Sequence, residues 1–125
     1  MMSLDDLNAR VTEAILRAER LTTGSVQAEE AFREVAGLEE AIARLTPASG
    51  LEGQSARLGA VTAALSAAEP LRALVLVERY LAEGIPPEAA AKLAALRAEA
   101  DADLAVLASN APLVRPLKYT LQEAA

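Results

Sequence analysis

Apolar residues recur along most of this chain at alternating spacings of three and four positions. Three long series of this kind cover residues 4–21, 28–45 and 89–107. Such a spacing places the apolar side chains on one face of an α-helix. Charged residues fill the positions between them, in several places as acid–base pairs four residues apart, such as Glu13 and Arg17. The pattern therefore predicts amphipathic helices that bury one face.

Residues that begin helices precede two of these series. Ser3 and Ser25 are good N-caps for the first and second helices. A third helix is expected over residues 52–68, where many Gly and Ala residues make a smooth surface that a neighbouring helix can approach closely. Pro70 leaves two alternatives: it begins a fourth helix, which the capping-box spacing of SAAE at residues 66–69 favours, or it kinks one long helix.

Helices of this length joined by short turns pack as antiparallel neighbours. We therefore expect an all-α fold, an antiparallel bundle of four to five helices over residues 1–111. A short extended C-terminal tail is expected over residues 112–125, because Pro112 and Pro116 interrupt a helix and the following LKYTLQ alternates apolar and polar residues. Composition agrees with helices, since aromatic residues make up only 2% of the chain and Ala and Leu supply most of its 53% hydrophobic residues.

The helix expected after Pro70 has unusually little polar surface. Arg72, Arg79 and Glu83 share one side of it, and Leu76 projects beside this polar stripe. The helix is then either a central one, wrapped by the others, or one that partly faces another subunit. On the second alternative, replacing Leu76 with Glu should weaken a dimer more than the fold. The candidate interaction residues on this helix are Leu76, Val75 and Tyr80.

The predicted tail carries a second apolar face. Leu117, Tyr119 and Leu121 alternate with polar residues, so in an extended segment they point to one side. The tail either packs along its own bundle, frays, or acts as an arm that docks on another protomer or adds a strand to a partner. Leu117, Tyr119 and Leu121 are therefore the second group of candidate interaction residues.

The residues that are missing narrow the chemistry. The chain has no cysteine and no histidine, which removes thiolate chemistry and the commonest general base and metal ligand. A net charge of −6 disfavours binding to nucleic acid. The start of the chain shows no secretory signal and no stretch is apolar enough for a bilayer, so we expect no membrane association and a cytoplasmic location.

Carboxylates are the remaining candidates for catalysis. Glu29, Glu30 and Glu34 share one helix, and an all-carboxylate Mg²⁺ site is possible in principle. All-α nucleotide pyrophosphohydrolases of the MazG kind use such sites, but their paired-Glu spacing is not reproduced here. Most of these acids also have an Arg four residues away, which is typical of a solvated face. We therefore expect no metal, no cofactor and no stabilisation by Mg²⁺.

Taken together, these patterns predict a non-catalytic helical protein–protein interaction module: an adaptor, scaffold or regulatory subunit. We expect it to self-associate, as a homodimer, and to bind a protein partner that the sequence does not identify. Two alternatives stay open. One is a Mg²⁺-dependent all-α nucleotide hydrolase that uses helix carboxylates. The other is a nucleic-acid-associated accessory protein that uses Arg side chains such as Arg10, Arg17 and Arg20.

Overall fold

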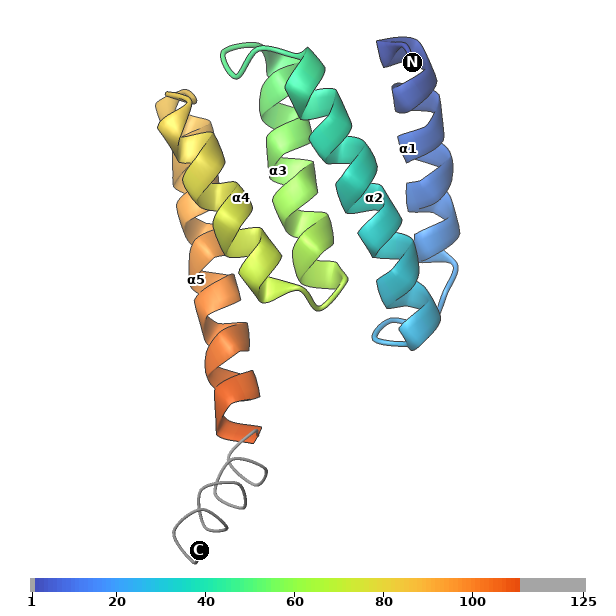
Figure 1. Ribbon diagram of the computed structural model, residues 1–125, viewed down its shortest axis with the longest axis vertical. Coiled ribbons are helices and arrows are strands. Elements are labelled where there is room, and N and C mark those ends of the chain that lie inside the picture. Colours follow the sequence, from blue (N-terminus) through green and yellow to red (C-terminus); the bar gives the residue numbers. More distant parts are fainter. Residues whose placement is uncertain (1, 111–125) are drawn as a thin grey trace, which may run out of the picture.

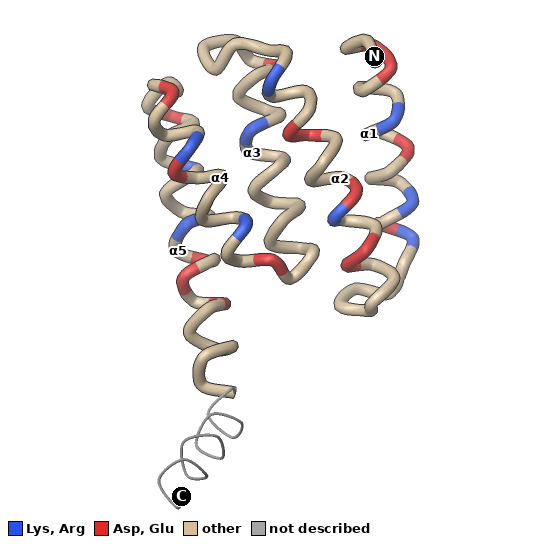
Figure 2. Tube along the Cα trace, in the orientation of Figure 1, with Lys and Arg blue, Asp and Glu red and all other residues tan. Residues whose placement is uncertain are grey.

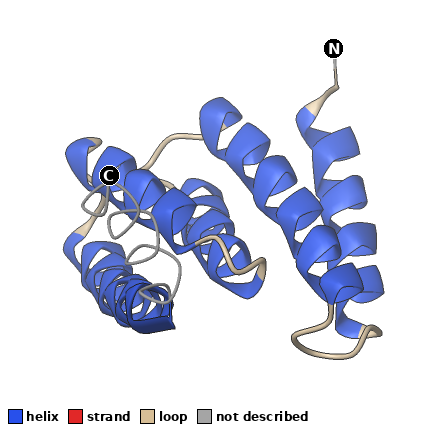
Figure 3. Ribbon diagram, turned by 60° about the horizontal axis from the view of Figure 1, so that its bottom comes forward, coloured by secondary structure: helices blue, strands red, loops and turns tan. Residues whose placement is uncertain are grey.

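The protein is all-α, as its sequence predicts. The computed structural model describes residues 2–110, and within that range it contains five helices and no strand (Figures 1 and 3). The predicted tail, residues 112–125, lies outside the described residues. The helices are α1 (Leu4–Glu19), α2 (Val26–Leu45), α3 (Leu51–Ser66), α4 (Pro70–Ala82) and α5 (Pro87–Asn110).

The helices begin where local chemistry satisfies their first backbone N–H groups. The Ser3 hydroxyl accepts a hydrogen bond from the Asp6 N–H at 3.1 Å, and the Asp6 carboxylate accepts one from the Ser3 N–H at 3.3 Å. Ser25 caps α2 in the same way, accepting from the Ala28 N–H at 3.1 Å. Both predicted N-caps are confirmed.

Pro70 begins a new helix, which resolves the two alternatives left by the sequence. It occupies the first turn of α4, and before it Ala68 has a left-handed backbone with φ 60°, which no continuous helix allows. The predicted capping box is wrong in detail. Ser66 is the last residue of α3, while the N-cap of α4 is Glu69, which makes no side-chain capping bond.

The helices form an array in which each packs on the next one along the chain (Figure 1). In addition, α3 packs on α5, so α3 touches α2, α4 and α5 and is the central helix. The alternative that placed α4 at the centre is wrong, since within the described residues its backbone packs only on α3 and α5, while long side chains alone join it to α2. Small side chains explain the role of α3: Ala60, Ala63 and Ala64 are buried and let neighbouring backbones approach, and Figure 2 shows how few charges it carries.

A single core joins all five helices. Its largest fully buried side chains come from α2, α3, α4 and α5, and burying side chains of this size is the main source of stability in such a fold. They are Ile42, Val61, Leu76, Val77 and Leu93.

The last helix is longer than its neighbours. It has 24 residues, and Figure 1 shows its C-terminal end reaching beyond the ends of the other helices. Its last buried residue is Ala100, so the apolar series of α5 continues for two turns without full cover. In the part of the chain that the structure describes, no helix is both long enough and apolar enough to cross a membrane.

Candidate interaction surface

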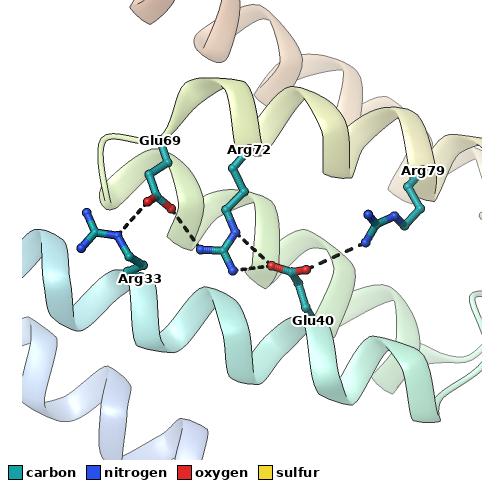
Figure 4. Close-up of polar contacts among 5 residues, drawn as sticks. All are labelled: Arg33, Glu40, Glu69, Arg72 and Arg79. Carbon is teal, nitrogen blue, oxygen red and sulfur yellow. Dashed lines mark hydrogen bonds and ion pairs between the residues drawn. The ribbon is translucent and has the colours of Figure 1, made fainter.

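The polar stripe of α4 faces α2 and stays partly exposed. Arg72 donates from Nε to Glu40 on α2 at 3.0 Å and from Nη1 to Glu69 at 3.0 Å. Arg79 lies 3.9 Å from the other oxygen of Glu40, and Arg33 of α2 pairs with Glu69 at 2.7 Å (Figure 4). The charges on this side of α4 therefore bind complementary charges on α2 and at the start of α4 itself.

Because this stripe lies against α2, two of the candidate interaction residues, Leu76 and Tyr80, are buried. Leu76, which lies on the same side of α4, is only 2% exposed, and Tyr80 is 3% exposed. They are candidate interaction residues on the alternative that this helix partly faces another subunit, and Leu76 lies beside charged neighbours, which normally mark the solvent side of a helix. Here those neighbours are held by ion pairs to another helix, so the apolar residues between them lie in the core.

Arg57 of α3 lies between α2 and the C-terminal end of α4. Its guanidinium donates to the carbonyl oxygens of Ala43 and Gly53 at 3.0 and 2.9 Å, and to Glu83 at 2.7 Å. It also lies over the ring of Tyr80, 5.6 Å from the centroid. Burial raises the pKa of the Tyr80 phenol to about 12. Arg57 is almost fully buried, and its contacts join α2, α3 and α4, which is a structural role.

The outer side of α4 is apolar. Leu71 is 66% exposed and Val75, the third candidate on this helix, is 57% exposed. Glu78, also exposed on α4, forms an ion pair with Arg97 of α5. Because the charges of α4 are committed to its neighbours, its solvent side keeps Leu and Val side chains that no described residue covers.

These side chains continue onto the protruding end of α5. Val106 and Leu107 are more than half exposed, and Leu104 is half-buried. Of the eight large hydrophobic side chains that are exposed in residues 2–110, four lie here, on α4 and the end of α5. We call this the α4–α5 surface, and its members are Leu71, Val75, Leu104, Val106 and Leu107.

Two hollows lie in the α4–α5 surface. One has a volume of about 460 Å³ and is lined by Pro70, Leu71, Leu104 and Leu107, among others. The other has a volume of about 270 Å³ and is lined by Leu65 of α3 and by Asp103, Val106 and Leu107 of α5, among others. Contiguous exposed apolar surface of this kind is typical of a contact with another molecule.

The carboxylates considered for Mg²⁺, Glu29, Glu30 and Glu34, lie on α2. Glu34 pairs with Arg17 of α1 at 2.7 Å, and Arg17 was one of the cations considered for nucleic acid. In residues 2–110 no group of three acidic side chains is arranged to hold a metal ion.

Sequence reasoning missed Leu71, Val106 and Leu107 as surface residues. The signal that identifies the last two is the length of α5, whose apolar series is longer than that of the helices beside it. The candidates Leu117, Tyr119 and Leu121 lie outside the described residues, so their role stays a prediction. Comparison of the chain with protein-family models, with curated proteins and with solved structures finds no match.

Proposed function

We propose that the chain is a non-catalytic helical interaction module that self-associates through the α4–α5 surface. The observation that carries this proposal is the exposed apolar surface itself, in which Leu71 and Val106 project beside two hollows. In a two-fold dimer the same patch lies on both sides of the interface, so it must contain both projections and depressions. The α4–α5 surface contains both, which favours a second copy of this chain as its occupant.

The surroundings of the surface support the same proposal. The nearest acids and bases of α4 pair with one another, with α2 or with α5, so pairing two copies would remove apolar surface from water without breaking many ion pairs. Apolar area buried without loss of polar partners is the main driving force of stable association. An adaptor or scaffold would then present its remaining surface to a protein partner.

Light scattering at micromolar concentration tests self-association. The intact chain should give about twice the 13.0 kDa mass of one copy. Leu71→Glu and Val106→Glu, each made alone, should shift the mass toward one copy, because each places a charge in the contact. Leu51→Glu is the matched control: Leu51 is 86% exposed at the start of α3, away from the α4–α5 surface.

Two results would contradict this proposal. One is an intact chain that stays at 13.0 kDa over the whole concentration range. The other is a Leu51→Glu variant that dissociates as readily as Leu71→Glu. Dissociation would then follow from the added charge and not from its place in the α4–α5 surface. Circular dichroism of each variant shows whether its helices are intact.

The tail is tested separately. If residues 112–125 form a docking arm, removing them should leave the helices folded and lower the measured mass. Tyr119→Ala should give part of that loss, ~1–3 kcal/mol if the ring is a buried anchor. Loss of helicity on truncation would instead make the tail part of its own core, and no change in either measurement would mark it as a frayed end.

A further inference from the structure

A third hollow lies on a different side of α2 from the ion pairs with α4. It has a volume of about 410 Å³ and is bounded by α1 and α3, with one face of α2 as its floor. Apolar side chains from all three helices line it: Ile15 from α1, Phe32 from α2 and Leu58 from α3. We call it the α1–α3 groove. Its size lies in the range of ~300–1,000 Å³ that holds small organic ligands.

Two carboxylates and no cation line the α1–α3 groove. They are Glu19 of α1 and Glu39 of α2, while α3 contributes only hydroxyl groups, such as that of Thr62, as polar side chains. The groove therefore has a negative potential inside apolar walls. Such a site favours a positively charged ligand and disfavours an anion.

Glu39 is the central polar group of this groove. Its carboxylate lies against the backbone of Gly59 on α3, so closely that a methyl group at position 59 would overlap one of its oxygens. It forms no ion pair and no hydrogen bond with any residue in the described range. Because no fully buried side-chain oxygen in the described range lacks a partner, the Glu39 oxygens are not fully buried, and Glu39 lines the groove.

The position of Glu39 is unfavourable for stability. Burial raises the pKa of its carboxyl group to about 7, because the charged form loses hydration and gains no partner. An apolar or neutral residue would fit the same walls at lower cost. A partly buried carboxylate that has no partner and lowers stability is typical of a binding site.

We propose that the α1–α3 groove binds a small organic cation, an alkylammonium whose charged head pairs with Glu39. The apolar body of the ligand would lie against Ile15, Phe32 and Leu58, which supply most of the walls. Glu19 adds a second negative charge at the α1 side and excludes ligands that carry a carboxylate of their own. Gly59 leaves the space in which the Glu39 carboxylate lies.

Isothermal titration of the full-length chain with hexylamine tests the proposal at pH 8. Hexanol and hexanoate are the matched neutral and anionic probes, since they keep the apolar chain and change only the head. Hexylamine should bind at least about tenfold more tightly than hexanol, because a charged hydrogen bond in a partly buried site adds that much. Hexanoate should not bind.

Two variants locate the site. Glu39→Gln should weaken hexylamine binding about tenfold or more, and Gly59→Ala should do part of the same damage by displacing the carboxylate. Glu30→Gln is the control: Glu30 is exposed on the same helix and does not line the groove, so it removes the same charge without effect.

The pH dependence is a second readout. Glu39 must be ionised to bind the ammonium head, so affinity should rise by about tenfold from pH 6 to pH 8 as pH passes its pKa of about 7. The other charged side chain that lines the groove is Glu19 on α1, and the polar side chains from α3 are hydroxyls. The rise should disappear in Glu39→Gln.

Three results would overturn the proposal. The first is no binding of hexylamine up to about 10 mM, a limit at which even a weak fragment is detected. The second is equal affinity for hexylamine and hexanol, or unchanged affinity in Glu39→Gln. The third is binding of the capped amino acid N-acetyl-lysine-N-methylamide with none of hexylamine, which would assign the groove to a lysine side chain of a protein partner.

Discussion

Glu39 and Glu40 are consecutive residues of α2 with opposite surroundings. Glu40 faces α4, where Arg72 binds it through two nitrogens and Arg79 lies 3.9 Å away (Figure 4). Glu39 faces the α1–α3 groove, where no described cation reaches it. The two residues are about 100° apart around the helix, which is enough to place them in different interfaces.

The difference shows that α2 has a closed side and an open side. On the closed side the charges of α4 meet opposite charges, and Leu76 fills the space between them. On the open side α1 and α3 are kept apart, and a carboxyl group lies in an apolar hollow. Substitutions should therefore have opposite signs on the two sides: loss of stability on the closed side, and gain on the open side.

The largest effect is expected inside the closed side. Leu76→Glu would place a charge at a position that is 2% exposed, and it should lower the free energy of unfolding by ~4 kcal/mol or more. Thermal and urea denaturation followed by circular dichroism measure it. Leu51→Glu, at a position that is 86% exposed and outside the α4–α5 surface, is the control and should change stability by less than ~0.5 kcal/mol. Similar losses in both variants would contradict the placement of Leu76 in the core.

Glu40→Gln should come next. It removes the partner of a half-buried guanidinium and leaves Arg72 with Glu69 alone, so the free energy of unfolding should fall by ~1–2 kcal/mol. Urea denaturation at pH 7 gives the value. Arg79→Gln removes the longer ion pair of Glu40. A smaller loss in the free energy of unfolding is expected there, because Arg79 is about half exposed. An unchanged midpoint in Glu40→Gln would show that the closed side is not held by its charges.

Glu39→Gln should have the opposite sign and depend on pH. The pKa of the Glu39 carboxyl is 4.5 in the unfolded chain and about 7 in the folded chain. Between these pH values the folded state binds more protons than the unfolded state, so the free energy of unfolding falls as pH rises from 4.5 to 7. Gln avoids this loss. After a discount for partial exposure, the variant should be more stable by ~1 kcal/mol at pH 8 and equal to the native chain at pH 4.5.

Paired urea titrations at the two pH values measure the effect of Glu39→Gln. Glu30→Gln controls for the change in net charge, because Glu30 is exposed on the same helix. A destabilised Glu39→Gln at pH 8 would mean that the carboxylate has a favourable partner, and the open side would then resemble the closed one.

The smallest effect is expected at the exposed end of the ion-pair chain. Burial would raise the pKa of Glu69, but hydrogen bonds from Arg33 and Arg72 outweigh it and lower the pKa. Arg33 is nearly half exposed, so Arg33→Gln should cost no more than ~0.5 kcal/mol. If the measured loss equals that of Glu40→Gln, the five charged residues act as one unit, and a double variant would show a coupling between them.

The regular helices were predictable, because their apolar series settle both type and extent. The caps at Ser3 and Ser25 agree with the structure, and so do the apolar series of α1 and most of those of α2 and α5, whose last members, Leu45 and Leu107, are exposed. The third helix, expected over residues 52–68, spans Leu51–Ser66. These features depend on residues close together in the chain, which is why the sequence alone determines them.

The direction of α4 and the character of Glu39 were not predictable in this way. A stripe of Arg72, Arg79 and Glu83 reads as a solvent face unless Glu40 and Arg57, far away in sequence, are known to meet it. Likewise, Glu39 and Glu40 look equivalent until α1 and α3 are known to border Glu39 and Arg72 of α4 is known to bind Glu40. The direction of the α4 stripe and the surroundings of Glu39 both depend on contacts between helices. The apolar periodicity of one helix does not indicate which charges its neighbour presents.

The way α1 is attached has a consequence for dynamics. Within residues 2–110, α1 packs along its length on α2 alone, and a hydrogen bond of 2.9 Å from the Asn8 amide to Glu52 joins it to α3. A helix that packs on one neighbour can open without unfolding the rest, so the amide hydrogens of α1 should exchange with solvent sooner than those of α3. A ligand that touches Ile15 and Leu58 at once would join α1 to α3 and slow that exchange.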